Sequence, residues 1–382
     1  MKKMLCVLLL LPLLRLPAGA VQVLSDSDIA VAAPSAILIE ASTGETIYEK
    51  NALEHRSIAS VTKIMTMLIA AEEIDSGRLS LDDTVTASAR AASMGGSQIW
   101  LEEGEQMSVG EMLKCIAVVS ANDCCTALAE HIAGTEDAFV ARMNEKAAQL
   151  GMNDTHFTCC SGLLESDLHY SCARDIAVMS RELLKHDFIR SYTTLWMDTI
   201  RNGEFTLANT NKLIYYYPGA TGLKTGFTTR AMYCLSASAE RDGTEYIAVV
   251  LGAQTSAERF DSAKALLNFA FANYSVLDPA GAVPLPAVTV ELGETGSVSP
   301  ALPPDSGILA AKKEQDGISY EVKLPPSVKA PVYEGQMLGS LVVTGGGKTI
   351  AELPLVASCG VPRLSVGGIF MALLRSAVGV GG

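Results

Sequence analysis

Three short polar strings contain the residue types of a serine acyl-transfer site. They are S-V-T-K at residues 60–63, S-A-N at residues 120–122 and K-T-G at residues 224–226. A serine hydroxyl is a weak nucleophile until a neighbouring base removes its proton. A lysine can be that base when burial and adjacent positive charge lower its pKa, because a neutral amine is then present at working pH. Each string alone is a weak signal, since S-x-x-K arises by chance about once or twice in a chain of this length.

Ser60 and Lys63 lie one helical turn apart at the start of a helix predicted over residues 57–74. Side chains three positions apart share one face of a helix, and the free N–H groups at its N-terminus favour developing negative charge. The alternative is a helix-capping serine followed by a solvated lysine. Lys63 interrupts a strongly apolar stretch over residues 58–71, where a freely solvated lysine is less expected. The spacing therefore predicts Ser60 as the nucleophile and Lys63 as its base.

The second string lies between two predicted helices. Apolar periodicity predicts helices over residues 109–119 and 123–133, and the string falls at the break between them. A polar trio at such a break is a helix cap by default. If the string belongs to a serine site, Ser120 and Asn122 are the members that carry its chemistry.

The third string lies in a region of strand character, beside a strand predicted over residues 233–239. The default interpretation is a surface loop with an ordinary lysine. Lys224 could instead supply the positive charge that keeps Lys63 neutral, and it could hold a substrate carboxylate. Gly226 has no Cβ and would let a substrate backbone approach the strand edge closely.

The elements around these strings mix helices and strands. Strand signals occur near both ends of the first 275 residues, and the helical signals lie mostly between them. This order predicts an α/β sandwich whose sheet brings the N- and C-terminal strands together. The expected elements are a hairpin over 34–50, helices over 57–74, 109–151 in several pieces, 176–184 and 256–273, and strands over 233–239 and 246–251.

The composition changes near Leu277. From there the chain has Pro/Gly punctuation and short alternating runs, which predict a small all-β domain over residues 277–360 after a catalytic domain over residues 21–276. The tail, residues 361–382, carries a single apolar helical face and predicts an amphipathic helix that lies on a membrane surface. The alternative for the tail is a helix packed on its own protein.

The N-terminus predicts an exported protein. Residues 1–20 combine two lysines, an apolar run and an A-G-A cleavage site, which is the pattern of a signal peptide. An uncleaved N-terminal anchor is the alternative. The net charge of -13 excludes a nucleic-acid partner, because phosphate binding needs a surplus of Lys and Arg.

The nine cysteines do not form a metal-binding pattern. No C-x-x-C occurs, and no histidine stands at zinc-ligand spacing, so we predict no metal site. An exported protein can form disulfides. The 49% apolar composition does not require them, however, and most of the cysteines are expected to be small buried hydrophobes with no assigned pairing.

Taken together, the three strings closely resemble the signature of the low-molecular-mass penicillin-binding proteins, specifically the serine D-alanyl-D-alanine carboxypeptidases. The order and wide separation of the strings match, and further segments are similar to other blocks of that family. The resemblance covers residues 34–275 and continues into the β-rich domain and the tail. The similar segments are residues 57–66, 95–97, 101–106, 153–157, 169–171, 209–211 and 221–226.

The resemblance implies the penicillin-binding protein fold, with a mixed antiparallel sheet and a helical subdomain, and it implies a two-step mechanism. Lys63 takes the proton of Ser60, which attacks the penultimate D-alanine of a peptidoglycan stem pentapeptide ending in D-Ala-D-Ala. Ser120 relays a proton to the leaving D-alanine, bridging between Lys63 and Lys224, and Asn122 positions the substrate amide. Water then hydrolyses the acyl-enzyme.

The same resemblance assigns the remaining site residues. The terminal carboxylate binds at Lys224 and Thr225, beside Gly226, and the backbone N–H groups of Ser60 and Phe227 form the oxyanion hole. No metal or organic cofactor is required, and β-lactams are expected to acylate the serine covalently. The protein is expected to act in cell-wall synthesis or remodelling, at the outer face of the cytoplasmic membrane.

Three rival functions remain open at this point. A β-lactamase shares the nucleophile but hydrolyses the drug adduct quickly, and a DD-endopeptidase cuts cross-links. Both usually lack the β-rich domain. A non-catalytic wall-binding or β-lactam-sensing protein is the third, and the intact Ser60, Lys63, Ser120 and Lys224 argue against it.

Overall fold

The computed structural model describes residues 23–24, 29–164, 166–368 and 370. The chain divides into two compact units that separate between Ser275 and Val276, called here the N-terminal and C-terminal units. The predicted signal peptide, residues 1–20, lies outside the described residues, as does most of the predicted tail. Among the helices that the structure describes, none is both long enough and apolar enough to span a membrane.

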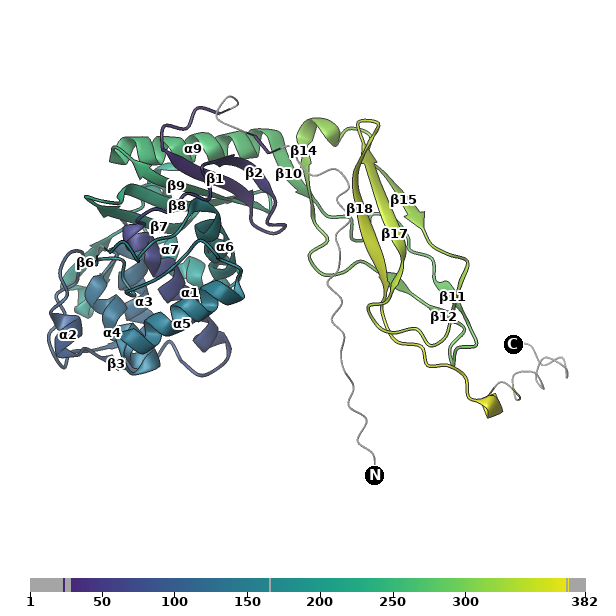
Figure 1. Cartoon of the computed structure of the whole chain (residues 1–382), viewed down its shortest axis with the longest axis horizontal. Helices are drawn as coiled ribbons and strands as arrows, with labels where there is room; N and C mark the ends of the chain where they lie inside the picture. Colours follow the sequence, from purple (N-terminus) through teal and green to yellow (C-terminus); the bar gives the residue numbers. More distant parts are fainter. Residues whose placement is uncertain (1–22, 25–28, 165, 369, 371–382) are drawn as a thin grey trace. The chain divides into compact units, whose positions relative to one another are not determined.

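The N-terminal unit is built on a five-stranded antiparallel sheet (Figure 1). The strand order is β2-β1-β9-β8-β7, so the N-terminal hairpin pairs with strands from the end of the unit. This order confirms the predicted α/β sandwich with its N- and C-terminal strands side by side. The strands are β1 (Ser35–Glu40), β2 (Thr46–Lys50), β7 (Ala220–Thr228), β8 (Met232–Arg241) and β9 (Thr244–Ala253).

Helices cover both faces of this sheet (Figure 1). Helix α9 (Ser256–Asn273) packs on β8 and β9, with the bounds that the sequence predicts, while α6 (Ala173–Leu184) packs on β1 and β9 from the other face. Helix α1 (Lys63–Asp75) runs through the helical layer and contacts α4, α5 and α6. It therefore buries side chains all round, as expected for a central helix.

Some helices of the N-terminal unit begin at recognisable capping residues. Ser108 and Glu111 form a reciprocal capping box at the start of α3, and Thr255 caps α9 by accepting from the Glu258 N–H. The further helices and turns of this unit are α2 (Ala89–Ala92), α3 (Val109–Val118), α4 (Asn122–Ala133), α5 (Glu136–Gln149), α7 (Arg190–Thr193), α8 (Leu213–Tyr216), η1 (Ala59–Thr62), η2 (Asp187–Ile189) and η3 (Arg201–Gly203).

Two short hairpins lie outside the main sheet, and the sequence analysis did not predict them. They pair β3 (Thr84–Thr86) with β4 (Gln106–Ser108), and β5 (Met197–Ile200) with β6 (Phe205–Ala208). Short strands of three or four residues carry too little alternation to be recognised in a sequence.

The C-terminal unit is all-β, as predicted. A three-stranded and a four-stranded sheet each bury a small apolar cluster. Strand β10 (Tyr274–Leu277) spans the division between the two units. The further elements are β11 (Val288–Glu291), β12 (Ser297–Val298), β13 (Pro300–Ala301), β14 (Ile308–Ala311), η4 (Lys312–Glu314), β15 (Ser319–Lys323), β16 (Ser327–Lys329), β17 (Met337–Gly345) and β18 (Lys348–Ala357).

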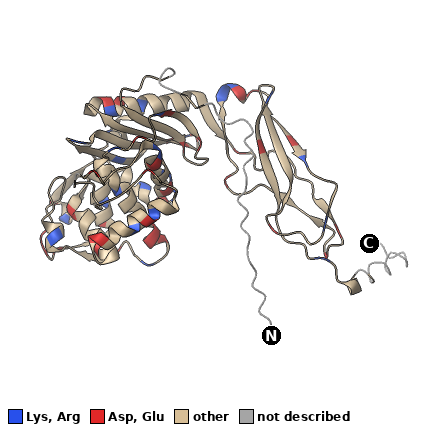
Figure 2. Cartoon of the chain, viewed as in Figure 1, with Lys and Arg blue, Asp and Glu red and all other residues tan. Residues whose placement is uncertain are grey.

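Acidic and basic residues are interspersed along the helices of the N-terminal unit (Figure 2). Acidic residues outnumber basic ones, 42 to 29. Residues of both signs are therefore mixed along the helices of this unit.

Candidate active site

Ser60 lies in the 3-10 turn η1, which leads directly into α1 at Lys63. The sequence predicts one helix over residues 57–74, and the structure instead begins the α-helix at Lys63. Ala59, just before the serine, has a φ of +47°, a conformation that an L-residue adopts only when its surroundings enforce it. Thr62 enforces part of it, because its Oγ1 donates to the Ala59 carbonyl at 2.8 Å. The turn leaves Ser60 partly exposed while its neighbours are buried.

The Lys63 amine is fully buried and makes three hydrogen bonds. Its Nζ lies 3.0 Å from Ser60 Oγ, 2.6 Å from Asn122 Oδ1 and 2.7 Å from the Ser161 carbonyl oxygen. The contact with Ser60 places both side chains on one face, as their spacing predicts. A neutral amine in this position can accept the Ser60 proton, whereas an ammonium donates to all three oxygens.

Burial lowers the pKa of Lys63, because an ammonium loses its hydration inside the protein. Burial also lowers the pKa of Lys224 well below its ordinary value, and the charges of Lys63 and Arg259 lower it further. Within the described residues, no carboxylate forms an ion pair with either lysine. Two neighbouring buried ammonium groups disfavour each other, so the pair favours a state with a neutral amine. For Lys63 itself, burial is the cause that lowers the pKa, rather than the charge on Lys224 that the sequence suggests.

The S-A-N string lies at the junction of α3 and α4, where it was expected. Ser120 has a φ of +65° and is 4% exposed, and its hydroxyl has no hydrogen-bond partner. It therefore bonds to neither lysine in this structure, in contrast to the bridge that the sequence analysis describes. Asn122 Nδ2 donates to the Gly95 carbonyl at 2.7 Å, which turns Oδ1 towards Lys63.

The K-T-G string lies in the edge strand β7, beside the turn that holds Ser60. A Cβ on Gly226 would lie 2.6 Å from the Ile58 carbonyl oxygen and 3.2 Å from the Ser60 nitrogen. Glycine is therefore needed so that the strand can pack on the nucleophile turn. The sequence predicts that Gly226 lets a substrate backbone approach, and the structure shows that this glycine also gives room to the chain's own backbone. Thr225 Oγ1 donates to Thr210 Oγ1 at 2.7 Å, and the next residue, Phe227, is 53% exposed.

The loop over residues 159–163 contributes a residue that sequence reasoning did not place in the site. Ser161 supplies a carbonyl oxygen to Lys63, a role that no side-chain pattern can reveal. Gly162 allows the close packing, because a Cβ there would lie 1.9 Å from the Ala59 carbonyl oxygen.

Arg259 of α9 was also missed. Its Nη1 donates to the carbonyl oxygens of Gly226 and Cys234, both at 3.3 Å, and so supports the K-T-G strand from behind. Burial lowers the pKa of Arg259 to about 10. An arginine inside an otherwise buried helix face is a signal that the sequence offered.

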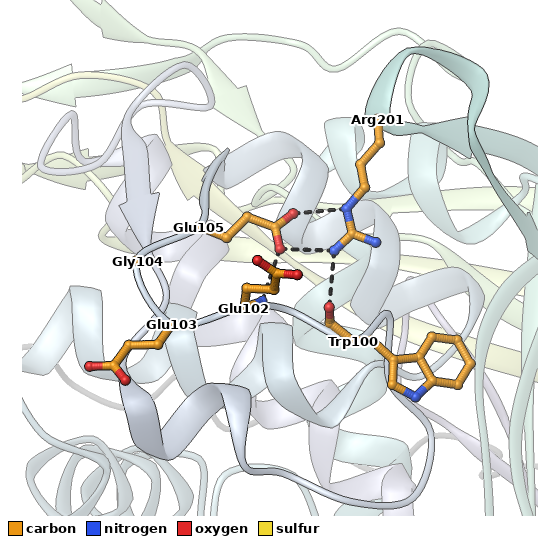
Figure 3. Close-up of a pocket in the computed structure, with 6 residues that line it drawn as sticks. All are labelled: Trp100, Glu102, Glu103, Gly104, Glu105 and Arg201. Carbon is orange, nitrogen blue, oxygen red and sulfur yellow. Dashed lines mark hydrogen bonds and ion pairs between the residues drawn. The ribbon is translucent and has the colours of Figure 1, made fainter.

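Arg201 fixes the position of the segment around Trp100. Arg201 donates to the Glu105 carboxylate and to the Trp100 carbonyl oxygen (Figure 3). It also donates to the Ile99 carbonyl oxygen at 2.9 Å. Trp100, Glu105 and Arg201 are among the residues that line an open pocket of about 590 Å³. The hydrogen bonds from Arg201 also fix the chain just beyond Ser97, whose carbonyl accepts the Asn122 N–H at 2.7 Å.

A buried lysine beside a serine, on a helical layer packed against an antiparallel sheet, defines a serine acyl-transfer enzyme of the penicillin-binding class. Comparison with known proteins gives the family. Residues 21–255 match the D-alanyl-D-alanine carboxypeptidase family, and residues 279–363 match the C-terminal domain of penicillin-binding protein 5. The chain therefore belongs to the D-alanyl-D-alanine carboxypeptidase family and is a serine-type hydrolase.

Three similar proteins illustrate the relationship. D-alanyl-D-alanine carboxypeptidase DacF of Bacillus subtilis is 44% identical over 336 residues, 87% of this chain and 86% of DacF. Penicillin-binding protein 5 of Haemophilus influenzae has a TM-score of 0.78 at 28% identity, covering 87% of this chain and 98% of that one. Penicillin-binding protein D2 of Listeria monocytogenes, solved in its ampicillin-bound form, has a TM-score of 0.58 at 31% identity, covering 63% and 98%. The β-lactamase and endopeptidase alternatives are not favoured.

Proposed function

We propose that this protein removes the terminal D-alanine from peptidoglycan stem pentapeptides through an acyl-enzyme on Ser60. Neutral Lys63 takes the hydroxyl proton as Ser60 Oγ attacks the carbonyl carbon of the penultimate D-alanine. The C–N bond to the last D-alanine breaks, an ester to Ser60 forms, and the amine leaves with a proton. A water molecule then hydrolyses the ester and regenerates the serine.

The remaining site residues bind and stabilise the reacting groups in this proposal. Ser120 hands the proton to the leaving amine, since its hydroxyl is buried and has no other partner. Lys224 and Thr225 bind the terminal carboxylate. The backbone N–H groups of Ser60 and Phe227 hold the oxyanion, which is commonly the largest single contribution in acyl transfer.

The observation that carries the proposal is the position of Lys63. Its amine is 0% exposed and lies 3.0 Å from Ser60 Oγ, and no carboxylate among the described residues neutralises it. A buried amine without a counter-ion is disfavoured as a cation. Its neutral, basic form is therefore more populated than that of an ordinary lysine at the same pH.

The test measures two products on one preparation. The protein is given a stem pentapeptide, and free D-alanine is measured together with the lifetime of a labelled penicillin adduct. We expect D-alanine release and a persistent adduct, and Ser60→Ala should lose both. Ser57→Ala is the matched control, because Ser57 is a partly buried serine three residues away. Rapid drug turnover without D-alanine release would instead indicate a β-lactamase, and activity retained by Ser60→Ala would overturn the assignment.

We also propose that the protein acts outside the cytoplasm, with residues 1–20 as a signal peptide and residues 361–382 as a membrane-surface helix. The apolar face of the tail sequence supports this assignment. Deleting residues 362–382 should release the protein from the membrane fraction. Continued sedimentation with membranes after the signal peptide has been removed would contradict the proposed role of the tail.

A further inference from the structure

Two buried thiols lie next to the base of the proposed mechanism. The cysteines in the described residues are unpaired, and all of them but Cys359 are buried. Cys125 and Cys160 are 0% exposed, and Cys125 Sγ donates to the Cys160 carbonyl oxygen at 3.3 Å. The Cys160 thiol donates to Glu136 Oε1, also at 3.3 Å. Most buried cysteines act only as small hydrophobes, so their position beside Lys63 distinguishes this pair.

Each thiol belongs to a segment that supplies an oxygen to the Lys63 amine. Cys125 follows Asn122 by one turn of α4, and Asn122 Oδ1 accepts from Lys63 at 2.6 Å. Cys160 directly precedes Ser161, whose carbonyl oxygen accepts from Lys63 at 2.7 Å. A covalent bond between the thiols would therefore join the two segments that position the base.

The two thiols are electrostatically unequal. Burial raises the pKa of Cys125, but its interaction with Cys160, together with the charge of Lys63 while that amine is protonated, outweighs burial and lowers the pKa overall. The pKa of Cys160 is raised well above its ordinary value by the same interaction and by burial. Thiolates are the attacking species in thiol–disulfide exchange, so Cys125 is the attacking thiol and Cys160 the resolving one.

We propose that Cys125 and Cys160 are a redox-active dithiol that closes to a disulfide and slows the acylation of Ser60. The oxidant is a low-molecular-mass disulfide, which reaches the pair when the loop over residues 159–163 opens. Cys125 attacks one of its sulfurs, forming a mixed disulfide and releasing the first thiol. Cys160 then attacks the Cys125 sulfur and releases the second thiol, which takes up the Cys160 proton. Two cysteine thiols are oxidised and one external disulfide is reduced to two thiols.

The effect on rate follows from geometry. A disulfide has a fixed dihedral preference and draws its two Cβ atoms to about 3.8 Å. Pulling the 159–163 loop towards α4 moves the Ser161 carbonyl and Asn122 relative to Lys63. Displacement of a catalytic group by about 1 Å can lower a rate on the order of 100-fold. This part of the inference rests on the proposed role of Lys63, whereas formation of the disulfide does not.

The experiment measures the cross-link and the rate separately. One sample of the purified protein is incubated natively with oxidised glutathione, and a second is collected after export by a host cell with an oxidising extracytoplasmic space. Free thiols are alkylated, and tryptic peptides are analysed by mass spectrometry. Trypsin leaves Cys125 in the peptide 115–142 and Cys160 in the peptide 147–174. Labelled penicillin then reports the acylation rate before and after reduction with dithiothreitol.

We expect the two peptides to be joined in at least one sample, and acylation to be slower by tenfold or more until dithiothreitol restores it. Cys125→Ser and Cys160→Ser should lose both the cross-link and the sensitivity to oxidant. The double variant Cys115→Ser/Cys124→Ser is the matched control and should keep both, because these are buried cysteines of α3 and α4 that supply neither thiol of the proposed pair. Absence of the cross-link from both samples would overturn the proposal, as would its persistence in Cys125→Ser or an unchanged rate in cross-linked protein.

Discussion

The histidine that contacts the nucleophile turn, His169, is expected to make the stability of the folded protein depend on pH. The ring is 3% exposed, and its Nδ1 accepts the Thr158 N–H at 3.0 Å. Its Nε2 lies 2.8 Å from Thr62 Oγ1, whose own proton goes to the Ala59 carbonyl. A neutral ring with its proton on Nε2 satisfies every partner. Protonation of Nδ1 would direct one N–H group at another, next to the turn that holds Ser60.

The pKa of His169 is lowered from 6.5 to about 4, first by burial and then by the charge of His156. Because the folded pKa lies below the unfolded one, the folded state binds fewer protons between these two values. The stability contributed by the neutral ring is fully present above pH 6.5 and is lost as the pH falls towards 4. At pH 5 the loss is about 2 kcal/mol, since each unit of pKa difference corresponds to about 1.4 kcal/mol.

The assay compares unfolding of wild type and His169→Gln in urea at pH 8 and pH 5. Both tryptophans, Trp100 and Trp196, lie in the N-terminal unit, so their fluorescence reports its unfolding. The wild type should lose about 2 kcal/mol more than the variant between the two pH values. His131→Gln removes an exposed histidine and should behave like the wild type.

Equal losses in wild type and His169→Gln would refute this reasoning. A direct measurement remains if the variant does not fold. A histidine NMR titration of the wild type should then find one ring that stays neutral at pH 5, and a fully protonated set at that pH would contradict the assignment.

Three further predictions concern the site. Lys63→Arg keeps a permanent positive charge and should slow penicillin acylation about 10²- to 10⁴-fold. Wild-type acylation should fall on acidification, because the amine becomes protonated. A variant rate near that of the wild type would count against a lysine base. Gly226→Ala places a Cβ 2.6 Å from the Ile58 carbonyl oxygen and should slow acylation at least about tenfold. Gly95→Ala is the control and should not slow it, because no atom lies within 4 Å of a Cβ there. Equal rates for the two variants would contradict the packing argument. Ser120→Ala removes a buried hydroxyl that has no hydrogen-bond partner. The free energy of unfolding in urea should therefore be unchanged or higher by about 1 kcal/mol, although D-alanine release falls. A marked destabilisation would contradict the absence of a partner for this hydroxyl.

The periodic spacing of apolar residues predicts most of the helices and strands. Long helices and long strands have different spacings, so they can be told apart without knowing what they pack against. Helix α9 has the bounds that the sequence predicts, and the break between α3 and α4 falls at the S-A-N string. The short antiparallel pairs β3–β4 and β5–β6 are not predicted, because strands of three or four residues form only through what they pair with and pack against. The 3-10 turn before Lys63 was also missed, since its strained Ala59 is held by long-range contacts with Gly162.

The sequence by itself identified the reacting serine and lysine, because an S-x-x-K spacing on a helical turn brings two side chains together through local geometry alone. Only the tertiary structure decided what surrounds that pair. The Ser161 carbonyl and the Asn122 amide reach Lys63 from segments 98 and 59 residues away in the chain. Burial by these segments, rather than any feature of the S-x-x-K string, is what removes water from the amine and lowers its pKa.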